Sequence, residues 1–237
     1  VLAQRGAVPV VNLRMMVNAG YAADQFGLPG TANLAMDMLD EGTAQRTALE
    51  ISDELSLLGA TLEAGSNLDV STVALSALKE KLPGSLDLFA DVILNPTFPD
   101  EDFARLQKQQ LATIAQEKVQ PVGMALRVFP KLIYGEGHAY STPFTGSGTE
   151  ESVARIDTAG LKDFHANFFK PNNATLVVVG DVSRDELQPL LEQQFKGWKG
   201  GDVPQKNIAL VGQRAGPTVY LVDRPDSEQS VIFAGHV

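Results

Sequence analysis

The three histidines, His138, His165 and His236, are the first side chains to consider for metal binding or acid–base chemistry. Two histidines bind zinc together when they lie one helical turn apart, and no two of these are spaced that way. His138 lies in a glycine-rich segment, where a structural hydrogen bond is the expected role. His165 lies beside phenylalanines, as expected at the edge of a core, and His236 is next to the last residue. The histidines alone therefore predict no metal site.

The sequence also contains no residue pattern typical of a nucleophilic or phosphate-binding site. The chain has no cysteine, which excludes disulfides, thiolate catalysis, iron–sulfur clusters and cysteine-type zinc sites. Gly146-Ser147-Gly148 lacks the preceding strand of a nucleophile elbow, and segment 135–148 lacks the Gly-Lys-Ser/Thr ending of a phosphate-binding loop. Adjacent acids such as Asp40-Glu41 and Glu150-Glu151 are typical of a solvated surface. These residues offer no self-contained catalytic constellation.

The composition indicates an ordinary globular chain. Of its 237 residues, 44% are hydrophobic and 20% are charged, which excludes a wholly disordered, collagen-like or coiled-coil protein. The net charge of −10 disfavours nucleic acid as a partner. It suits a soluble protein, or one that handles cationic peptides. There is no run of about 18 apolar residues, so we expect no membrane span.

The order of the expected elements predicts the fold class. Apolar and polar residues alternate from 10 to 18, as in a strand with one buried face. Further strands are expected at 61–69, 71–78, 174–179, 218–222 and 230–234. Helices are expected at 32–40, 47–58, 83–94, 99–119, 121–134, 158–169 and 183–195. Because strands that are adjacent in sequence occur beside runs of helices, we predict an α+β fold.

The two ends of the chain resemble each other. Residues 2–6 precede the strand at Val10 much as residues 221–225 precede the strand at Val231, which indicates a weak repeat. We expect residues 1–205 to form one α+β repeat. Residues 206–237 are expected to form a linker and the first strands of a following repeat, with a turn at 224–226. Since the chain begins at Val1 without an initiator methionine, we interpret it as a piece of a longer protein.

Residues 30–43 resemble the first helix of the pitrilysin and insulinase type of zinc peptidase. They read Gly-Thr-Ala-Asn-Leu-Ala-Met-Asp-Met-Leu-Asp-Glu-Gly-Thr, where the family has Gly-Thr-Ala-His-x-x-Glu-His-Met-Leu-x-x-Gly-Thr. In the family the two histidines bind zinc, and the glutamate deprotonates the attacking water. Asn33 and Asp37 stand at the histidine positions and Met36 at the glutamate position. The frame of the motif is kept, and its zinc chemistry is lost.

The family's third zinc ligand is a glutamate on a later helix. Pro121 resembles the family's helix-ending proline, and counting back from it places the ligand position at Ala112 or Thr113. Neither residue binds zinc, and Glu117, the nearest acid, lies about one turn away on a different face. The resemblance therefore implies no catalytic residue, cofactor site or metal ligand in this chain, with zinc only in a catalytic half.

Other segments extend the resemblance over nearly the whole chain. Residues 134–146 are similar to the family's Tyr-Gly-x-His-Pro-Tyr loop, residues 168–181 to its helix-to-strand junction, and residues 223–230 to the start of its next repeat. Such peptidases are clamshells of two halves, each with two α+β repeats. The resemblance implies a mixed or antiparallel sheet with helices packed on one side. The chain is similar to the first repeat of the zinc-free half, whose substrate-holding Arg and Tyr would lie beyond Val237.

The resemblance implies a non-catalytic, peptidase-like module that completes the peptide-binding chamber of a catalytic half. That half would lie in the same chain or in a partner subunit, and we expect peptide as the ligand and the periplasm as the location. Three alternatives remain open. The chain could be a structural scaffold subunit, as inactive members are in respiratory assemblies. It could belong to a zinc protease whose activity lies elsewhere in the parent protein. It could also be an enzyme that binds a different metal through Asn33 and Asp37.

Overall fold

The computed structural model describes residues 1–213, 215–223, 225 and 229–237. Within them, five strands form one open sheet in the order β1-β5-β2-β4-β3. The strands are β1 (Leu2–Gln4), β2 (Val10–Val17), β3 (Thr61–Ser66), β4 (Ser71–Leu78) and β5 (Ala174–Gly180). The short β1 is parallel to β5, and the other neighbours are antiparallel. The sheet is therefore mixed, as expected.

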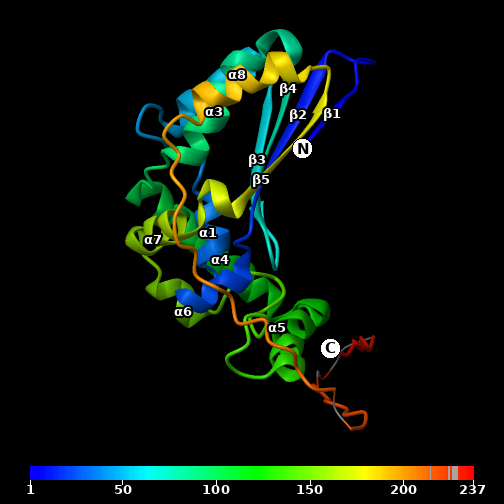
Figure 1. Ribbon diagram of the computed structural model, residues 1–237. Coiled ribbons are helices and arrows are strands. Elements are labelled where there is room, and N and C mark those ends of the chain that lie inside the picture. The colour runs from blue at the N-terminus through cyan, green and yellow to red at the C-terminus, as the bar shows by residue number, and fades with distance from the viewer. Residues whose placement is uncertain (214, 224, 226–228) are drawn as a thin grey trace.

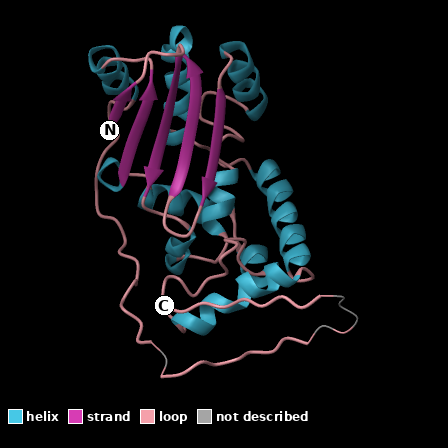
Figure 2. Cartoon of the chain, turned by 90° about the vertical axis from the view of Figure 1, so that its right-hand side faces the viewer, coloured by secondary structure: helices cyan, strands magenta, loops and turns pink. Residues whose placement is uncertain are grey.

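Helices cover one face of the sheet (Figure 1), and Figure 2 looks onto the face that carries none. The α-helices are α1 (Thr31–Asp37), α2 (Ala48–Leu58), α3 (Leu82–Leu94), α4 (Asp100–Glu117), α5 (Pro121–Tyr134), α6 (Glu150–Arg155), α7 (Thr158–Phe168) and α8 (Arg184–Gln194). The 3-10 helices are η1 (Tyr21–Phe26), η2 (Lys79–Lys81) and η3 (Pro171–Asn173). This arrangement confirms the predicted α+β class. None of the described helices has the length and apolar character needed to span a bilayer.

The core lies between the sheet and the helices because β2 alternates as its sequence predicts. Leu13 and Met15 are at most 3% exposed, whereas Arg14 between them is exposed. Leu13 lies opposite Leu75 of β4 and Val178 of β5, so the three central strands bury their apolar side chains on the same face.

Capping residues place the helix ends close to the predicted ones. Thr47 forms a capping box with Glu50 at the start of α2, and Gly59 ends the helix with a left-handed φ of 60°. Ser183 caps α8 in the same way. These signals are local, so they act independently of the tertiary fold.

The structure differs from the sequence prediction in several places. The elements β1, η1 and α6 were not expected, and α1 ends at Asp37 with a turn over residues 38–40. The strands predicted at 218–222 and 230–234 are wrong for this chain, because the described residues there form no strand. Leu221 and Ile232 are each 91% exposed and no described strand lies beside them, whereas a strand needs a hydrogen-bonded neighbour. Residues 224 and 226 of the expected turn lie outside the described residues. The division into two repeats stays a prediction.

Candidate functional site at helix α1

The start of helix α1 contacts the buried carboxyl group of Asp24. Asp24 in η1 accepts hydrogen bonds from the backbone N–H groups of Gly30 (2.7 Å) and Ala32 (2.9 Å), which satisfies two donors at the start of the helix. Burial raises the pKa of Asp24 to about 8, and the two hydrogen bonds oppose that rise. The start of α1 is thereby fixed to η1.

The start of α1 is also held from the opposite side. Gln110 of α4 donates hydrogen bonds to the carbonyl oxygens of Gly30 (3.2 Å) and Ser147 (2.8 Å). Ser152 of α6 donates to the carbonyl of Pro29 (2.7 Å). These contacts fix the helix that carries the motif positions against α4, α6 and the loop at 135–148.

The three motif positions on α1 have different surroundings. Met36 is completely buried. Asn33 is half-buried, and its Oδ1 atom is buried without a hydrogen-bond partner among the described residues. Asp37 is exposed, and partial desolvation raises its pKa, with further contributions from Asp40 and Glu41. An amide, a thioether and one carboxylate do not fit the zinc site of the family, which needs imidazoles and a base.

An open depression of about 360 Å³ lies beside Met36 and Asp37, between α1, β3 and α4. Its lining residues are Met36, Asp37, Asp40, Leu62, Glu63, Ala64, Leu106 and Gln109. Strand β3 is the last in the sheet order, and no described strand pairs with its outer edge. The depression therefore lies next to backbone groups that another extended chain can use for hydrogen bonds.

Helix α4 brings Gln109, rather than Thr113, to the depression. Thr113 is exposed and donates through Oγ1 to the carbonyl of Gln109 (3.1 Å), and Ala112 is exposed as well. Glu117 lies elsewhere, where its Oε2 accepts hydrogen bonds from Arg127 and Ser147, both at 2.7 Å. Sequence reasoning missed Gln109 and Glu63. The helical period was the available signal for Gln109, because it lies four residues before Thr113.

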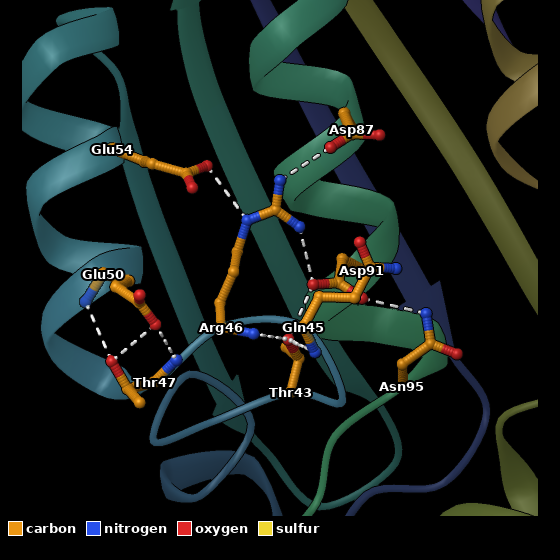
Figure 3. A network of polar contacts seen from close by, with 9 residues as sticks. All are labelled: Thr43, Gln45, Arg46, Thr47, Glu50, Glu54, Asp87, Asp91 and Asn95. Carbon is orange, nitrogen blue, oxygen red and sulfur yellow. Dashed lines mark hydrogen bonds and ion pairs between the residues drawn. The ribbon is translucent and has the colours of Figure 1, made fainter.

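The loop that follows α1 is fixed by Arg46 (Figure 3). Its guanidinium pairs with Glu54 (2.9 Å), Asp87 (2.7 Å) and Asp91 (2.7 Å), and Thr43 donates a further hydrogen bond to Asp91 (2.7 Å). Burial disfavours the charged form of Arg46, but its hydrogen bonds to the three carboxylates outweigh this effect and raise its pKa. The network therefore ties both α2 and α3 to the segment that leaves α1.

The histidines make structural contacts. His165 donates from Nε2 to the carbonyl of Ile93 (2.7 Å) and stacks on Phe169, and burial lowers its pKa. His138 accepts a hydrogen bond at Nδ1 from the backbone of Tyr140 (3.0 Å). His236 is exposed. The described residues contain no group of three or more histidine, aspartate or glutamate side chains placed to hold a metal ion.

Two family models match this chain. Residues 1–132 match the model described as Insulinase (Peptidase family M16). The chain belongs to the insulinase family. Residues 155–235 match the model described as Peptidase M16 inactive domain. The resemblance of residues 30–43 to this family is thereby confirmed.

Individual relatives support the assignment to the insulinase family. The chain is 26% identical over 234 residues to an uncharacterized zinc protease of Mycobacterium leprae, which covers 97% of this chain and 51% of the relative. It is 21% identical over 207 residues to the mitochondrial cytochrome b-c1 complex subunit 1 of Bos taurus, and the match covers 84% of this chain and 41% of that relative. The crystal structure of a peptidase M16 inactive domain from Pseudomonas fluorescens has a TM-score of 0.82 at 30% identity and covers 90% of this chain and 51% of that one. The chain thus spans about half the length of the zinc protease relative.

Proposed function

We propose that this chain is a non-catalytic module of a zinc metallopeptidase and completes the peptide-binding chamber of a catalytic half. The proposal rests on the residue types at the three motif positions of α1. The helix is held at both ends, yet it presents Asn33, Met36 and Asp37 where hydrolysis needs two zinc ligands and a base. A thioether cannot take a proton from water, so Met36 supplies no general base. The family likeness to an inactive domain supports the same role.

Peptide would dock at the edge of β3. An extended chain can add to an exposed strand through backbone hydrogen bonds, and side chains on one of its faces then enter the adjacent depression. The depression offers the carboxylates of Asp37, Asp40 and Glu63 beside the apolar Leu62 and Leu106. Negative charge there favours peptides that carry lysine or arginine.

Zinc belongs, in this proposal, to the catalytic half, in the same chain or in a partner subunit. Residues 1–205 form the first repeat of the zinc-free half, and residues 206–237 lead into the next. We propose the periplasm as the location, since a chain without cysteine has no thiol to protect from oxidation there. Cell fractionation tests this location, and recovery of the protein only in the cytoplasmic fraction contradicts it.

The activity test compares this chain, the zinc-bearing half and their mixture on an arginine-rich peptide and on a matched glutamate-rich peptide while zinc is titrated. We expect no zinc-dependent cleavage by this chain alone and faster cleavage of the arginine-rich peptide in the mixture. Glu63→Gln should reduce the gain, whereas Glu151→Gln, on the exposed side of α6, is the matched control. Zinc-dependent cleavage by this chain alone overturns the proposal.

A structural scaffold role is the second candidate, and the similarity to cytochrome b-c1 complex subunit 1 favours it. Co-purification separates the two candidates, because a scaffold is recovered with respiratory subunits and a chamber module with a zinc-bearing peptidase half. In the latter case the name zinc protease, which the mycobacterial relative carries, describes the zinc-bearing half. A metal analysis of the purified chain tests the remaining possibility, a different ion held by Asn33 and Asp37.

A further inference from the structure

Residues 198–209, here called the strap, run from the end of α8 along the helical side of the molecule toward α5 (Figure 1). The sequence predicts that the repeat ends at residue 205, within this stretch, and that a linker begins at residue 206. We infer that the strap is part of the fold of this domain, that it holds the loop at 135–148 in place, and that the chain first becomes free to move at Leu210. This inference holds whatever the chain binds.

The first half of the strap is fixed to the segment between α7 and β5. Trp198 donates from Nε1 to the carbonyl of Phe169 (2.9 Å). Gly201 and Asn172 exchange two hydrogen bonds of 3.0 Å and 2.9 Å. Lys170 donates to the carbonyl of Asp202 (2.5 Å). Several side-chain to backbone contacts within five residues distinguish this stretch from a solvated linker.

The second half of the strap joins three parts of the domain. Lys206 donates to Asn18 Oδ1 at the end of β2 (2.8 Å) and to the carbonyl of Asp69 in the bend between β3 and β4 (3.1 Å). The backbone N–H of Asn207 donates to Oε1 of Gln25 in η1 (3.0 Å). Lys206 is half-buried, and burial lowers its pKa, so the contact removes the ammonium from water.

The remaining hydrogen bonds of the strap are made with the loop at 135–148. The carbonyl of Asn207 accepts from the backbone of Ala139 (2.8 Å), and its side chain donates to the carbonyl of Gly137 (2.8 Å). His138 donates from Nε2 to the carbonyl of Ala209 (3.1 Å), since its Nδ1 is the acceptor for Tyr140. Three consecutive loop residues therefore bond to the strap.

The loop in turn lies against α1. Tyr140 donates to Asp69 Oδ1 (2.6 Å), and Tyr21 donates to the carbonyl of Phe144 (2.8 Å). Gly146 lies so close to Tyr21 and Asn33 that a Cβ atom there would be within 3 Å of both side chains. The loop contains no helix or strand, so its position depends on these contacts together with those of Ser147 to Gln110 and Glu117. The strap thus contributes to the cover over the first motif position of α1.

The hydrogen bonds of the strap stop after Ala209. The side chain of Leu210 is fully exposed, Val211 is half-buried, and residues 210–213 make no hydrogen bond with any described residue. Backbone without hydrogen bonds opens most easily. The point at which the chain becomes free to move is therefore placed after residue 209, four residues later than residue 205, where the sequence predicts that the repeat ends.

Amide hydrogen exchange and ¹⁵N relaxation on the 237-residue chain test the strap. We expect high order parameters for residues 198–209, about 0.85, and values below about 0.6 from residue 211 to residue 213. In the variant Lys206→Ala/Asn207→Ala, the exchange rate of the Ala139 amide should rise about tenfold, because three hydrogen bonds that hold the strap are lost. Lys199→Ala/Gln213→Ala, at exposed positions, is the matched control and should leave that rate unchanged.

Two results overturn the inference. One is an order parameter over residues 203–209 as low as that over 210–213 in the unmodified chain. The other is an Ala139 exchange rate that is the same in the unmodified chain and in the double variant. If the double variant loses its near-ultraviolet circular dichroism, the single variant Lys206→Ala provides the comparison, with a smaller expected increase in the rate.

Discussion

The guanidinium of Arg46 lies 2.7 Å from Oδ2 of Asp91, and the side chain of Asp91 is only 4% exposed. The pair joins the loop after α1 to the last turn of α3. Because Thr43 and Asn95 also donate to Asp91, the buried carboxylate has a partner on each oxygen. A satisfied buried pair resists opening, since separating it leaves a charge in a poorly solvated place. The position of α1 therefore depends on electrostatics beyond the helix as well as on packing.

Removing the charge of Arg46 should strongly destabilise the fold. We expect Arg46→Met to lower the free energy of unfolding by about 3–5 kcal/mol, because Asp91 stays buried without its cationic partner. Urea unfolding followed by circular dichroism measures the change. Arg105→Met is the control, since Arg105 is 53% exposed where it pairs with Glu41, and it should change the stability little. Equal effects of the two substitutions would contradict the role assigned to Arg46.

Restoring the family's glutamate at position 36 should destabilise the chain without activating it. Met36 is completely buried, and Asp37 and Asp40 lie beside the same depression. We expect Met36→Glu to cost about 3 kcal/mol or more at pH 7, because it buries a charge among acids. The isosteric control Met36→Leu should cost less than about 1.5 kcal/mol.

The pH dependence of Met36→Glu provides a second check. Burial raises the pKa of the introduced carboxyl above its unfolded value, so the folded state binds the proton more tightly. The variant should therefore recover stability as the pH falls toward 4 and lose it as the pH rises. Chemical unfolding between pH 4.5 and 7.5 measures this, and a loss that is independent of pH would show that the introduced carboxyl reaches solvent.

Local signals made much of the fold predictable. Thr47, Gly59 and Ser183 were placed at helix ends from the sequence because caps depend on nearby residues. Strand β1 was missed because it has three residues and pairs with β5, where Leu2 lies opposite Val178. The strands expected at 218–222 and 230–234 failed for the opposite reason: their residues suit strands, but no described strand lies beside them.

The candidate site was only partly predictable. The frame of residues 30–43 identified Asn33, Met36 and Asp37 as the motif positions, because this depends on sequence spacing alone. Their surroundings depend on tertiary packing, and so the sequence could not show that Met36 is buried while Asp37 is exposed. Counting from Pro121 indicated position 112 or 113, whereas the orientation of α4 brings Gln109 to the depression.

Acid should weaken the fold through His165. Burial lowers the pKa of this imidazole below its ordinary value of 6.5, so the folded state binds the proton less tightly than the unfolded chain. The contribution of the neutral His165 imidazole to the free energy of unfolding is complete above pH 6.5. It is lost as the pH falls from 6.5 toward the lower pKa of the folded state. In His165→Gln, whose amide can still donate to Ile93, we expect this loss to be smaller. Guanidinium unfolding at pH 7.5 and 5.5 measures it, with His236→Gln as the control, and parallel profiles for all three chains would contradict the prediction.

Gly146 should tolerate no side chain, for two separable reasons. Its φ of 72° is left-handed, and a Cβ atom would lie 2.6 Å from Cδ1 of Tyr21, whose hydroxyl is bonded to Phe144. Gly137 has a similar φ of 80° with no atom within 4 Å of its Cβ position, so it isolates the backbone effect. We expect Gly137→Ala to cost about 1–2 kcal/mol of unfolding free energy and Gly146→Ala about 1–3 kcal/mol more, because Tyr21 cannot move aside. Urea unfolding of both variants measures the difference. Equal losses of unfolding free energy would mean that Gly146 does not lie in close contact with Tyr21 of η1 and Asn33 of α1.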